Sequence, residues 1–347
     1  MQLNFQASTT ARRVLFAPGA SASLPDEVSA LCKRPLVITT ARGSEQGAAL
    51  TEGMSVAGYF AEATVHVPSE VVDRAVSVAS QTEADAYLAI GGGSTIGLAK
   101  AVALRDARPI LCVPTTFSGS EMTNIWGVQK GTTKTTGRND RVRPALVVYD
   151  PDLLRTLPRP VATTSGVNAI AHAIEAHYAH DTHPLLQLTA TEAIRSLAHA
   201  LPALSEGDEP NDALARALYG AYLAGLCLDG ASMGLHHKLC HLLGGRFSLP
   251  HSALHAVILP HAVAYNAEAA PRTMDAIRDA LGKEPAEGLL ALNHTLGIRD
   301  SLASLGIPED SLDDLAAAAI AQPYPNPRPL ELAGVRTLLR NAWANPS

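Results

Sequence analysis

Aromatic residues make up only 4% of this 347-residue chain. The formal net charge is −6, and the chain contains no block of like charge. This balance argues against a nucleic-acid or anionic-membrane partner. No apolar run reaches the ~18 residues that a membrane span requires, and no signal peptide is visible at the N-terminus. The four cysteines are widely spaced and form no CxxC pair, which predicts reduced thiols. These absences predict a soluble, cytoplasmic protein.

The length and the local patterns indicate two domains. Hydrophobic residues reach 47%, and 347 residues are too many for one small core. Prolines then punctuate the chain between residues 150 and 160. We therefore predict an α/β domain over residues 1–159 and an all-helical domain over residues 160–347.

In the first domain, short apolar runs alternate with segments of helical periodicity, which predicts a parallel, doubly wound sheet. The expected strands are residues 13–17, 35–40, 63–67, 86–90 and 109–113, and the expected helices are residues 22–31, 46–57, 71–82 and 96–104. Residues 128–134 and 144–149 could then pair as a hairpin.

The second domain shows helical apolar spacing and no strand-type runs. The expected helices are residues 164–179, 185–203, 213–228, 231–243, 254–267, 271–280, 286–296, 312–321 and 331–344. We expect Gly244-Gly245 to end the helix that begins at residue 231.

Three consecutive glycines, Gly91, Gly92 and Gly93, follow the expected strand 86–90 and open a helix. Without side chains, this backbone can approach a phosphate closely, and the helix N-terminus supplies free N–H groups. Ser94 and Thr95 are available as the N-cap. The run is not the GxGxxG fingerprint, whichever glycine the count begins from. An ordinary strand-to-helix turn is the alternative.

A second loop, Pro114-Thr-Thr-Phe-Ser-Gly-Ser-Glu121, follows the next strand. Its hydroxyl side chains can hydrogen-bond phosphates or an amide without adding charge; they are Thr115, Thr116, Ser118 and Ser120. Since ligands bind at the carboxyl edge of such sheets, the two loops favour one extended ligand lying across both. A solvated loop is the alternative.

Residues 234–251 contain four of the 13 histidines. His237 and His241 are four residues apart, so they share one face of a helix, and Asn168 and His172 have the same spacing upstream. The side chains that could converge on one pocket are Asn168, His172, His237, His241 and His251. Histidines scattered over helix surfaces are the alternative.

Five motifs together are specific, although each alone is weak. They are Gly91-Gly-Gly-Ser-Thr95, Pro114-Thr-Thr-Phe-Ser-Gly-Ser-Glu121, Lys134-Thr-Thr-Gly-Arg138, Ser165-Gly-Val-Asn-Ala-Ile-Ala-His172, and Gly234-Leu-His-His-Lys-Leu-Cys-His241 through Leu249-Pro-His251. With them the sequence resembles the iron-containing (group III) alcohol dehydrogenase superfamily, whose fold is shared with dehydroquinate synthase and glycerol dehydrogenase. Within it, the sequence is most similar to maleylacetate reductases.

The resemblance implies that NAD(P) binds across the two loops of the first domain, that the helical domain closes the cleft, and that the chain forms a homodimer. The cofactor-binding positions it implies are Thr40, Gly92, Gly93, Ser94, Thr95, Thr115, Thr116, Ser118 and Lys134. Thr40 stands where strongly NAD-selective relatives carry Asp, so no carboxylate claims the ribose 2′-hydroxyl or repels a 2′-phosphate. With Arg42 nearby, we expect the chain to accept NADPH alongside NADH.

Alcohol dehydrogenases of this superfamily hold a divalent metal with one Asp and three His. Those positions are Asn168, His172, His237 and His251 in this sequence. Because Asn168 is neutral and imidazoles bring no charge, the pull on a dication is weakened, although three histidines can still hold zinc. The threonine loop is also one residue shorter than in the alcohol dehydrogenases. Both departures resemble maleylacetate reductases, so we expect no metal requirement.

The implied reaction reduces the C=C bond of maleylacetate to give 3-oxoadipate in aromatic-compound degradation. Hydrogen-bond donors can stabilise the enolate that hydride addition forms, without a metal. We expect His241 or His251 to deliver the proton, with His172 and His237 orienting the substrate. The cations that could pair with the substrate carboxylates are Lys238, Arg138 and Arg328.

Three alternatives stay open. A metal-dependent alcohol or polyol dehydrogenase would carry stoichiometric zinc or iron. A dehydroquinate-synthase-like lyase would need a fuller set of metal ligands and more basic residues. A non-catalytic nucleotide-binding relative would have no reason to keep five polar groups at matching positions.

Overall fold

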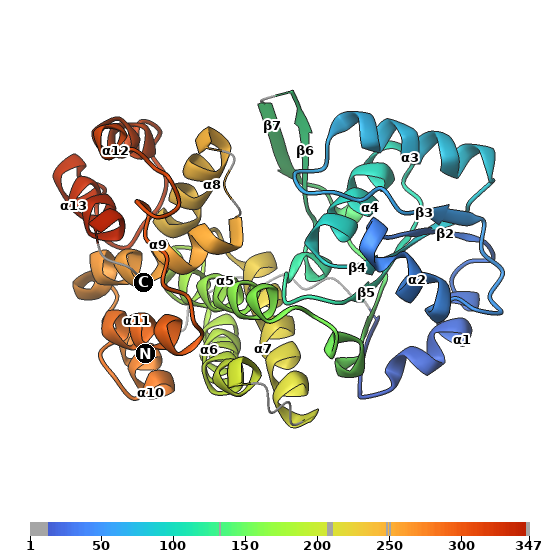
Figure 1. Ribbon diagram of the computed structural model, residues 1–347, viewed down its shortest axis with the longest axis horizontal. Coiled ribbons are helices and arrows are strands. Elements are labelled where there is room, and N and C mark those ends of the chain that lie inside the picture. The colour runs from blue at the N-terminus through green and yellow to red at the C-terminus, as the bar shows by residue number, and fades with distance from the viewer. Residues whose placement is uncertain (1–12, 132, 207–210, 248, 250, 345–347) are drawn as a thin grey trace. The chain divides into compact units, whose positions relative to one another are not determined.

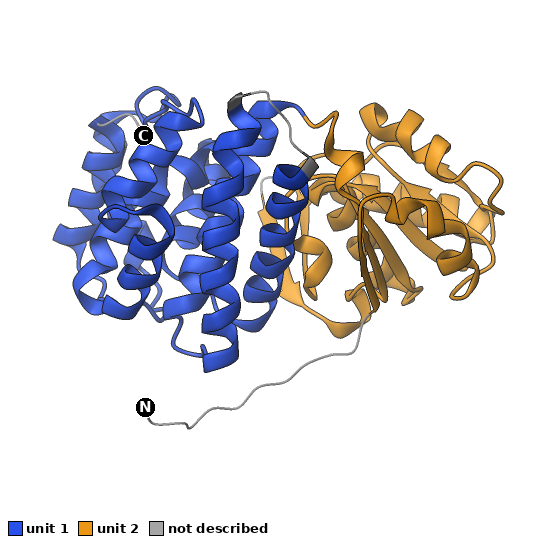
Figure 2. Cartoon of the chain, turned by 90° about the horizontal axis from the view of Figure 1, so that it is seen from below, with its two compact units in different colours: residues 1–7, 158–347 blue, residues 8–157 orange. Residues whose placement is uncertain are grey.

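The computed structural model describes residues 13–131, 133–206, 211–247, 249 and 251–344 (Figure 1). The chain divides into two compact units, coloured separately in Figure 2. The α/β unit ends at Leu157, and the helical unit begins at Pro158. The division predicted from the sequence lies two residues further along the chain.

The α/β unit is built on a six-stranded parallel sheet with the order β1-β8-β5-β4-β2-β3. Its strands are β1 (Arg13–Phe16), β2 (Pro35–Ile38), β3 (Gly58–Phe60), β4 (Ala86–Gly91), β5 (Ile110–Pro114) and β8 (Leu146–Tyr149). Every residue of β2, β5 and β8 is buried, as expected for strands covered on both faces. The predicted parallel, doubly wound sheet is confirmed.

Helices cover both faces of this sheet. They are α1 (Leu24–Ser29), α2 (Ser44–Leu50), α3 (Ser69–Gln81) and α4 (Gly93–Asp106), with the 3-10 turns η1 (Ala20–Ser23), η2 (Ala41–Gly43), η3 (Ser120–Met122), η4 (Asp140–Val142) and η5 (Pro151–Leu154). Leu24 and Val28 of α1 pack against Leu88 and Leu111 on one face. Right-handed crossovers place α1 and α2 on that face, and α3 and α4 on the other. The change of face falls between β2 and β4.

One predicted strand of this unit does not form. Residues 63–67 are irregular, and the strand β3 lies earlier, where Gly58–Phe60 pairs with Leu36–Ile38. His66 and Val67 have φ angles of 64° and 52°, which a strand cannot contain. The helix predicted over 46–57 likewise ends at Leu50, and Gly53 in the following turn has a positive φ.

The predicted hairpin is also wrong. β6 (Ile125–Lys130) pairs antiparallel with β7 (Thr133–Arg138), whereas Leu146–Tyr149 forms the strand β8 between β1 and β5. The reason is composition. Leu-Val-Val-Tyr is apolar throughout and suits a strand buried on both faces, whereas β7 is polar and mostly exposed.

The helical unit contains a helix in each segment that the sequence predicts. These helices are α5 (Arg159–Tyr178), α6 (Pro184–Glu206), α7 (Asn211–Gly230), α8 (Leu235–Phe247), α9 (His251–Asn266), α10 (Pro271–Leu281), α11 (Pro285–Thr295), α12 (Leu312–Ile320) and α13 (Leu332–Ala344), with the turns η6 (Ala267–Ala269) and η7 (Glu309–Ser311). Helices α5, α6 and α7 pack against one another, and a second core joins α8, α9, α12 and α13. No helix among the described residues has both the length and the apolar character for crossing a bilayer.

Helix α8 differs from its prediction at both ends. It begins at Leu235, and it continues through Gly244-Gly245 to Phe247. A glycine inside a helix costs only about 1 kcal/mol relative to alanine. Leu243 and Phe247 pack against the core on either side of the glycines, so burial outweighs that cost.

Candidate active site

Three stretches that the sequence assigns to the cofactor follow three neighbouring strands. Ile38 of β2 pairs with Ala89 of β4, and Gly91 of β4 pairs with Pro114 of β5. The residues after β2, β4 and β5 therefore meet at one edge of the sheet, at the change of helix face. This is the switch point at which doubly wound sheets bind ligands.

The glycine run forms the start of α4 without a side-chain cap. Gly92 is the N-cap residue, its backbone is extended, and the helix begins at Gly93. Ser94 and Thr95 therefore lie inside the first turn, and the prediction that they cap the helix is wrong. The N–H groups of this first turn have no acceptor within the helix, so they are available to an anion. The Thr95 side chain is fully buried, so its hydroxyl is not exposed at this edge.

The two loops pack tightly against each other. A Cβ placed on Gly92 would lie 2.7 Å from both Cγ2 and Oγ1 of Thr116. A Cβ on Gly93 would lie 3.3 Å from Cβ of Ser118. Glycine at both positions therefore allows residues 114–121, the hydroxyl loop, to lie against the start of α4.

Two buried ionisable residues, Lys100 and Glu121, bond to the hydroxyl loop and the residues next to it. Lys100 of α4 is fully buried and donates to the Ile125 carbonyl at 3.1 Å, to Thr123 Oγ1 at 2.9 Å and to the Ser120 carbonyl. The Glu121 carboxylate, also fully buried, accepts from the Tyr149 hydroxyl at 2.8 Å, and burial raises its pKa. Ser118 Oγ donates to Glu121 at 3.2 Å. One of the predicted cofactor hydroxyls is therefore engaged within the protein.

The other predicted cofactor residues lie at this edge or on the hairpin. Thr40 Oγ1 accepts from the Gly43 N–H at 3.1 Å and caps η2, which also carries the exposed Arg42. Thr115 is half-buried, and its N–H donates to the Gly91 carbonyl at 3.1 Å. Lys134 is exposed on β7.

In the helical unit, α5 and α8 bring histidines together. The rings of His172 and His237 stack, with centroids 4.8 Å apart and planes at 22°. His237 and His241 meet edge to face at 6.3 Å. Both His172 and His237 are buried, whereas His241 is exposed. The His251 side chain lies outside the described residues, although α9 begins at this position.

Several polar atoms at these positions are buried and have no hydrogen-bond partner among the described residues. They are Oδ1 of Asn168, Nδ1 of His172 and Nε2 of His237. Buried polar groups are rarely left unpaired, so such a group of atoms is expected where a ligand binds. The predicted convergence of polar side chains from α5 and α8 thus has a geometric basis for His172, His237 and His241.

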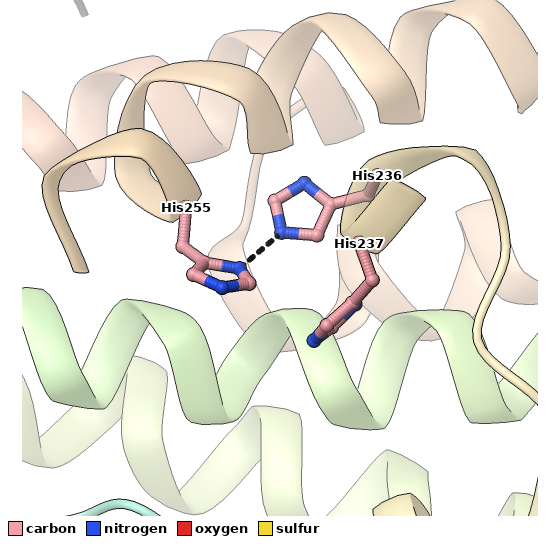
Figure 3. A group of neighbouring side chains, drawn as sticks. All are labelled: His236, His237 and His255. Carbon is pink, nitrogen blue, oxygen red and sulfur yellow. Dashed lines mark hydrogen bonds between the residues drawn. The ribbon is translucent and has the colours of Figure 1, made fainter. Parts of the chain in front are cut away.

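Two further buried histidines extend the cluster, and the sequence interpretation missed both. His236 Nε2 and His255 Nδ1 share a hydrogen bond of 2.8 Å, as Figure 3 shows. Burial, and then electrostatic interaction with His237, lower the pKa values of His172, His236 and His255 well below the usual range. A signal for His255 was present, because it lies four residues after His251 on what proves to be one helix.

Glu175 is the third residue that was missed. Its side chain is fully buried, and Oε2 accepts a hydrogen bond from Nδ1 of His237 at 2.6 Å. It follows His172 by three residues, a spacing that puts both on one face of α5. That spacing was the available signal.

The cations expected to pair with substrate carboxylates have partners of their own. The guanidinium of Arg328 lies 4.5 Å from the centroid of the Tyr265 ring, and Lys238 Nζ lies 5.6 Å from that of Tyr324. Arg138, on β7, donates to Asn124 Oδ1 at 3.3 Å. Cation–π contacts hold Arg328 and Lys238 near aromatic faces.

Comparison with known proteins defines the class. Residues 11–151 match the model of iron-containing alcohol dehydrogenase, and residues 162–343 match that of the Fe-containing alcohol dehydrogenase family, C-terminal. The chain therefore belongs to the iron-containing alcohol dehydrogenase family, an oxidoreductase family.

The similar proteins are more specific. The maleylacetate reductase of Sphingobium indicum is 49% identical over 95% of both chains, and that of a Pseudomonas species is 47% identical over 98% of both. The crystal structure of maleylacetate reductase from Agrobacterium tumefaciens superimposes with a TM-score of 0.95 at 41% identity, covering 99% of each chain. A 1,3-propanediol oxidoreductase, at 22% identity and a TM-score of 0.90, shares the fold.

The donors at the family's metal positions do not fit an iron site. Asn168 supplies a neutral amide oxygen, and the buried carboxylate nearby, Glu175, uses both oxygens in hydrogen bonds within the protein. Non-haem iron is typically held by two histidines and a carboxylate. Among the described residues, His236, His237 and His255 bring ring nitrogens within 4.8 Å of one another, but His236 and His255 are bonded to each other.

Proposed function

We propose that this protein is an NAD(P)H-dependent maleylacetate reductase, which reduces the C=C bond of maleylacetate to give 3-oxoadipate. One observation carries the proposal. The buried imidazoles of His172 and His237 and the neutral Asn168 stand where the resemblance implies metal ligands, in a chain 49% identical to a maleylacetate reductase. This site suits a substrate that is itself a conjugated ketone and needs no metal to polarise it.

The reaction adds one hydride and one proton. When bound, the reduced nicotinamide would supply a hydride to the alkene carbon remote from the ketone, and the displaced electron pair would move onto the ketone oxygen as an enolate. Hydrogen-bond donors at that oxygen stabilise the enolate. A proton then adds to the carbon next to the ketone and completes 3-oxoadipate.

The histidines divide these tasks. Burial lowers the pKa of His172, which favours the neutral imidazole, and a neutral imidazole acts as a hydrogen-bonding group. His172 and His237 orient the substrate, together with the Asn168 amide. The exposed His241, or His251, delivers the proton. Lys238, Arg138 and Arg328 are the cations that would attract the substrate carboxylates.

The reduced cofactor binds at the sheet edge that Gly92, Gly93 and the hydroxyl loop form in the α/β unit. Free N–H groups at the start of α4 suit the pyrophosphate. Thr40 places no carboxylate where it would repel a 2′-phosphate, so NADH and NADPH both serve. A homodimer in the cytoplasm completes the proposal. The cytoplasmic location is supported by four buried cysteines that form no disulfide.

The deciding experiment measures NADH and NADPH oxidation with maleylacetate, using enzyme treated extensively with chelator and checked for residual metal. We expect full activity without metal and less than a tenfold preference between the cofactors. Activity that vanishes and returns with zinc or iron would make the four positions a metal site. If maleylacetate is inert with and without metal, the substrate assignment is wrong, and a panel of alcohols with added metal is tested next.

A further inference from the structure

Glu175 contacts more groups of the histidine site than any role in packing requires. It is fully buried on α5, where the Tyr178 hydroxyl donates to Oε1 at 3.4 Å, and its other partners lie on and just before α8. Oε2 accepts from the Gly234 N–H at 3.1 Å and from His237 Nδ1 at 2.6 Å, while Oε1 accepts from the His236 N–H at 2.9 Å. A buried carboxylate is expensive unless it is paired and hydrogen-bonded, and here these bonds supply the compensation.

The backbone contacts fix where α8 begins. The first N–H groups of a helix lack partners within the helix and carry the positive end of its dipole. Gly234 and His236 present such groups, and Glu175 caps them from another helix. A Cβ on Gly234 would lie 3.2 Å from Glu175 Oε1, so glycine allows this close approach. Glu175 therefore sets the position of the backbone that carries His237.

The ring contact fixes the orientation of His237. Because an ionised carboxylate can only accept, Nδ1 of His237 carries the hydrogen in this bond. In the neutral ring Nε2 then holds the lone pair, and Nε2 is buried with no partner among the described residues. His236 and His255 face each other, whereas His237 turns toward the neighbouring helix (Figure 3). That helix is α5, since the His237 ring stacks on His172.

We propose that Glu175 is a positioning residue that holds His237 in the Nδ1–H tautomer, so that Nε2 is the nitrogen that exchanges hydrogen bonds and protons with the substrate. The role of His237 toward substrate rests on the proposed function. The tautomer does not, so the two can be tested separately.

Asp181 provides a matched control. It is a second carboxylate that holds the segment before α8, where it accepts from the Ser232 N–H at 3.0 Å and from the Ser232 hydroxyl at 2.7 Å. It also lies 3.8 Å from Nδ1 of His180, and it is exposed. Asp181→Asn therefore weakens the anchoring of this segment without touching the His237 ring.

The test compares full-length wild type, Glu175→Gln and Asp181→Asn, each labelled with ¹⁵N-histidine. The ¹⁵N shifts of the two ring nitrogens report the tautomer, and His237→Asn assigns the signal. In wild type we expect the proton on Nδ1. In Glu175→Gln either the amide oxygen or the NH₂ can face Nδ1, so the preference for Nδ1–H is lost and we expect a signal from the Nε2–H form to appear. In Asp181→Asn the tautomer stays as in wild type.

Kinetics with maleylacetate and NADH provide the second measurement. Loss of a partner that orients a functional histidine typically lowers activity by about 10–100-fold, so we expect that fall in kcat for Glu175→Gln with the KM for NADH within about twofold. Asp181→Asn should stay within about twofold of wild type in both. An equal loss in the two variants would show that Glu175 acts only by holding the segment, which overturns the proposal.

If Glu175→Gln does not fold, the wild-type spectrum alone still tests which ring nitrogen of His237 carries the proton. A neutral His237 with its proton on Nε2 would contradict the inference. If wild type fails to reduce maleylacetate while His237 carries its proton on Nδ1, the proposed substrate is wrong and the positioning by Glu175 stands.

Discussion

The two units of this protein build their sites from different parts of the chain. In the α/β unit the groups that we propose for ligand binding are backbone N–H groups at the start of α4 and hydroxyls of one loop, with glycines where the loops touch. In the helical unit they are imidazoles from α5 and α8. The first kind of site depends on backbone shape, and the second on side-chain tautomer and charge.

The buried ionisable residues of the two units also differ in what they contact. Lys100 and Glu121 lie behind the hydroxyl loop and bond to backbone carbonyls, hydroxyls and a tyrosine. Glu175 bonds directly to a histidine of the site. Changes in the α/β unit should therefore alter stability or cofactor affinity, whereas changes in the helical unit should alter the chemical step.

The largest effect is expected for His241→Ala. Loss of a general acid typically lowers the rate by about 10²–10⁴-fold, so kcat with maleylacetate should fall by that factor while the Kd of NADH is unchanged. Stopped-flow kinetics and fluorescence titration of NADH measure the two quantities. His199→Ala is the control, since His199 is another exposed helical histidine and contacts Arg216. An unchanged kcat in His241→Ala would reject its role and leave His251 as the proton donor.

A smaller effect, and one on stability, is expected for Lys100→Met. The change keeps an apolar stem but leaves the Ser120 and Ile125 carbonyls buried without this donor. We expect a loss of roughly 2–4 kcal/mol in the free energy of unfolding, measured by urea denaturation. Lys130→Met, at an exposed lysine, is the control. If the two variants are equally stable, Lys100 does not hold the loop.

The smallest of these effects is expected for Gly92→Ala. The added methyl meets Thr116 at 2.7 Å, and a β-branched side chain has few other rotamers, so the loops must separate. Overpacking of this kind costs about 1–3 kcal/mol, and we expect the Kd of NADH to rise by about tenfold or more. Gly245→Ala in α8 is the control, because a Cβ there meets nothing within 4 Å. If both variants bind NADH equally weakly, the assignment of the cofactor site to the α/β unit is contradicted.

Local patterns in the sequence were sufficient for much of the fold. Continuous apolar runs predicted the buried strands β2, β4 and β5, and the spacing of alanine and leucine predicted each segment that becomes a helix in the second unit. The glycine run between β4 and α4 is also a local pattern. It predicted a close approach of the backbone to a ligand, which glycine allows.

Patterns that depend on partners were less informative. The spacing of Asn168 with His172, and of His237 with His241, showed which side chains share a helix face, but not which residues meet across helices. His236 and His255 lie on different helices and bond to each other. The sequence did not show that Leu146–Tyr149 pairs with β1 and β5, because both partners are distant in the chain.

The sequence by itself thus determined the two kinds of unit, the glycine and hydroxyl loops and the histidine-bearing helices, because each depends on residues close together in the chain. Only the tertiary structure decided that Glu175 meets His237, 62 residues away, and that it caps the start of α8. A hydrogen bond between distant residues leaves no periodic trace in the sequence, since one carboxylate among the 33 acidic residues looks like any other until its partners are brought to it.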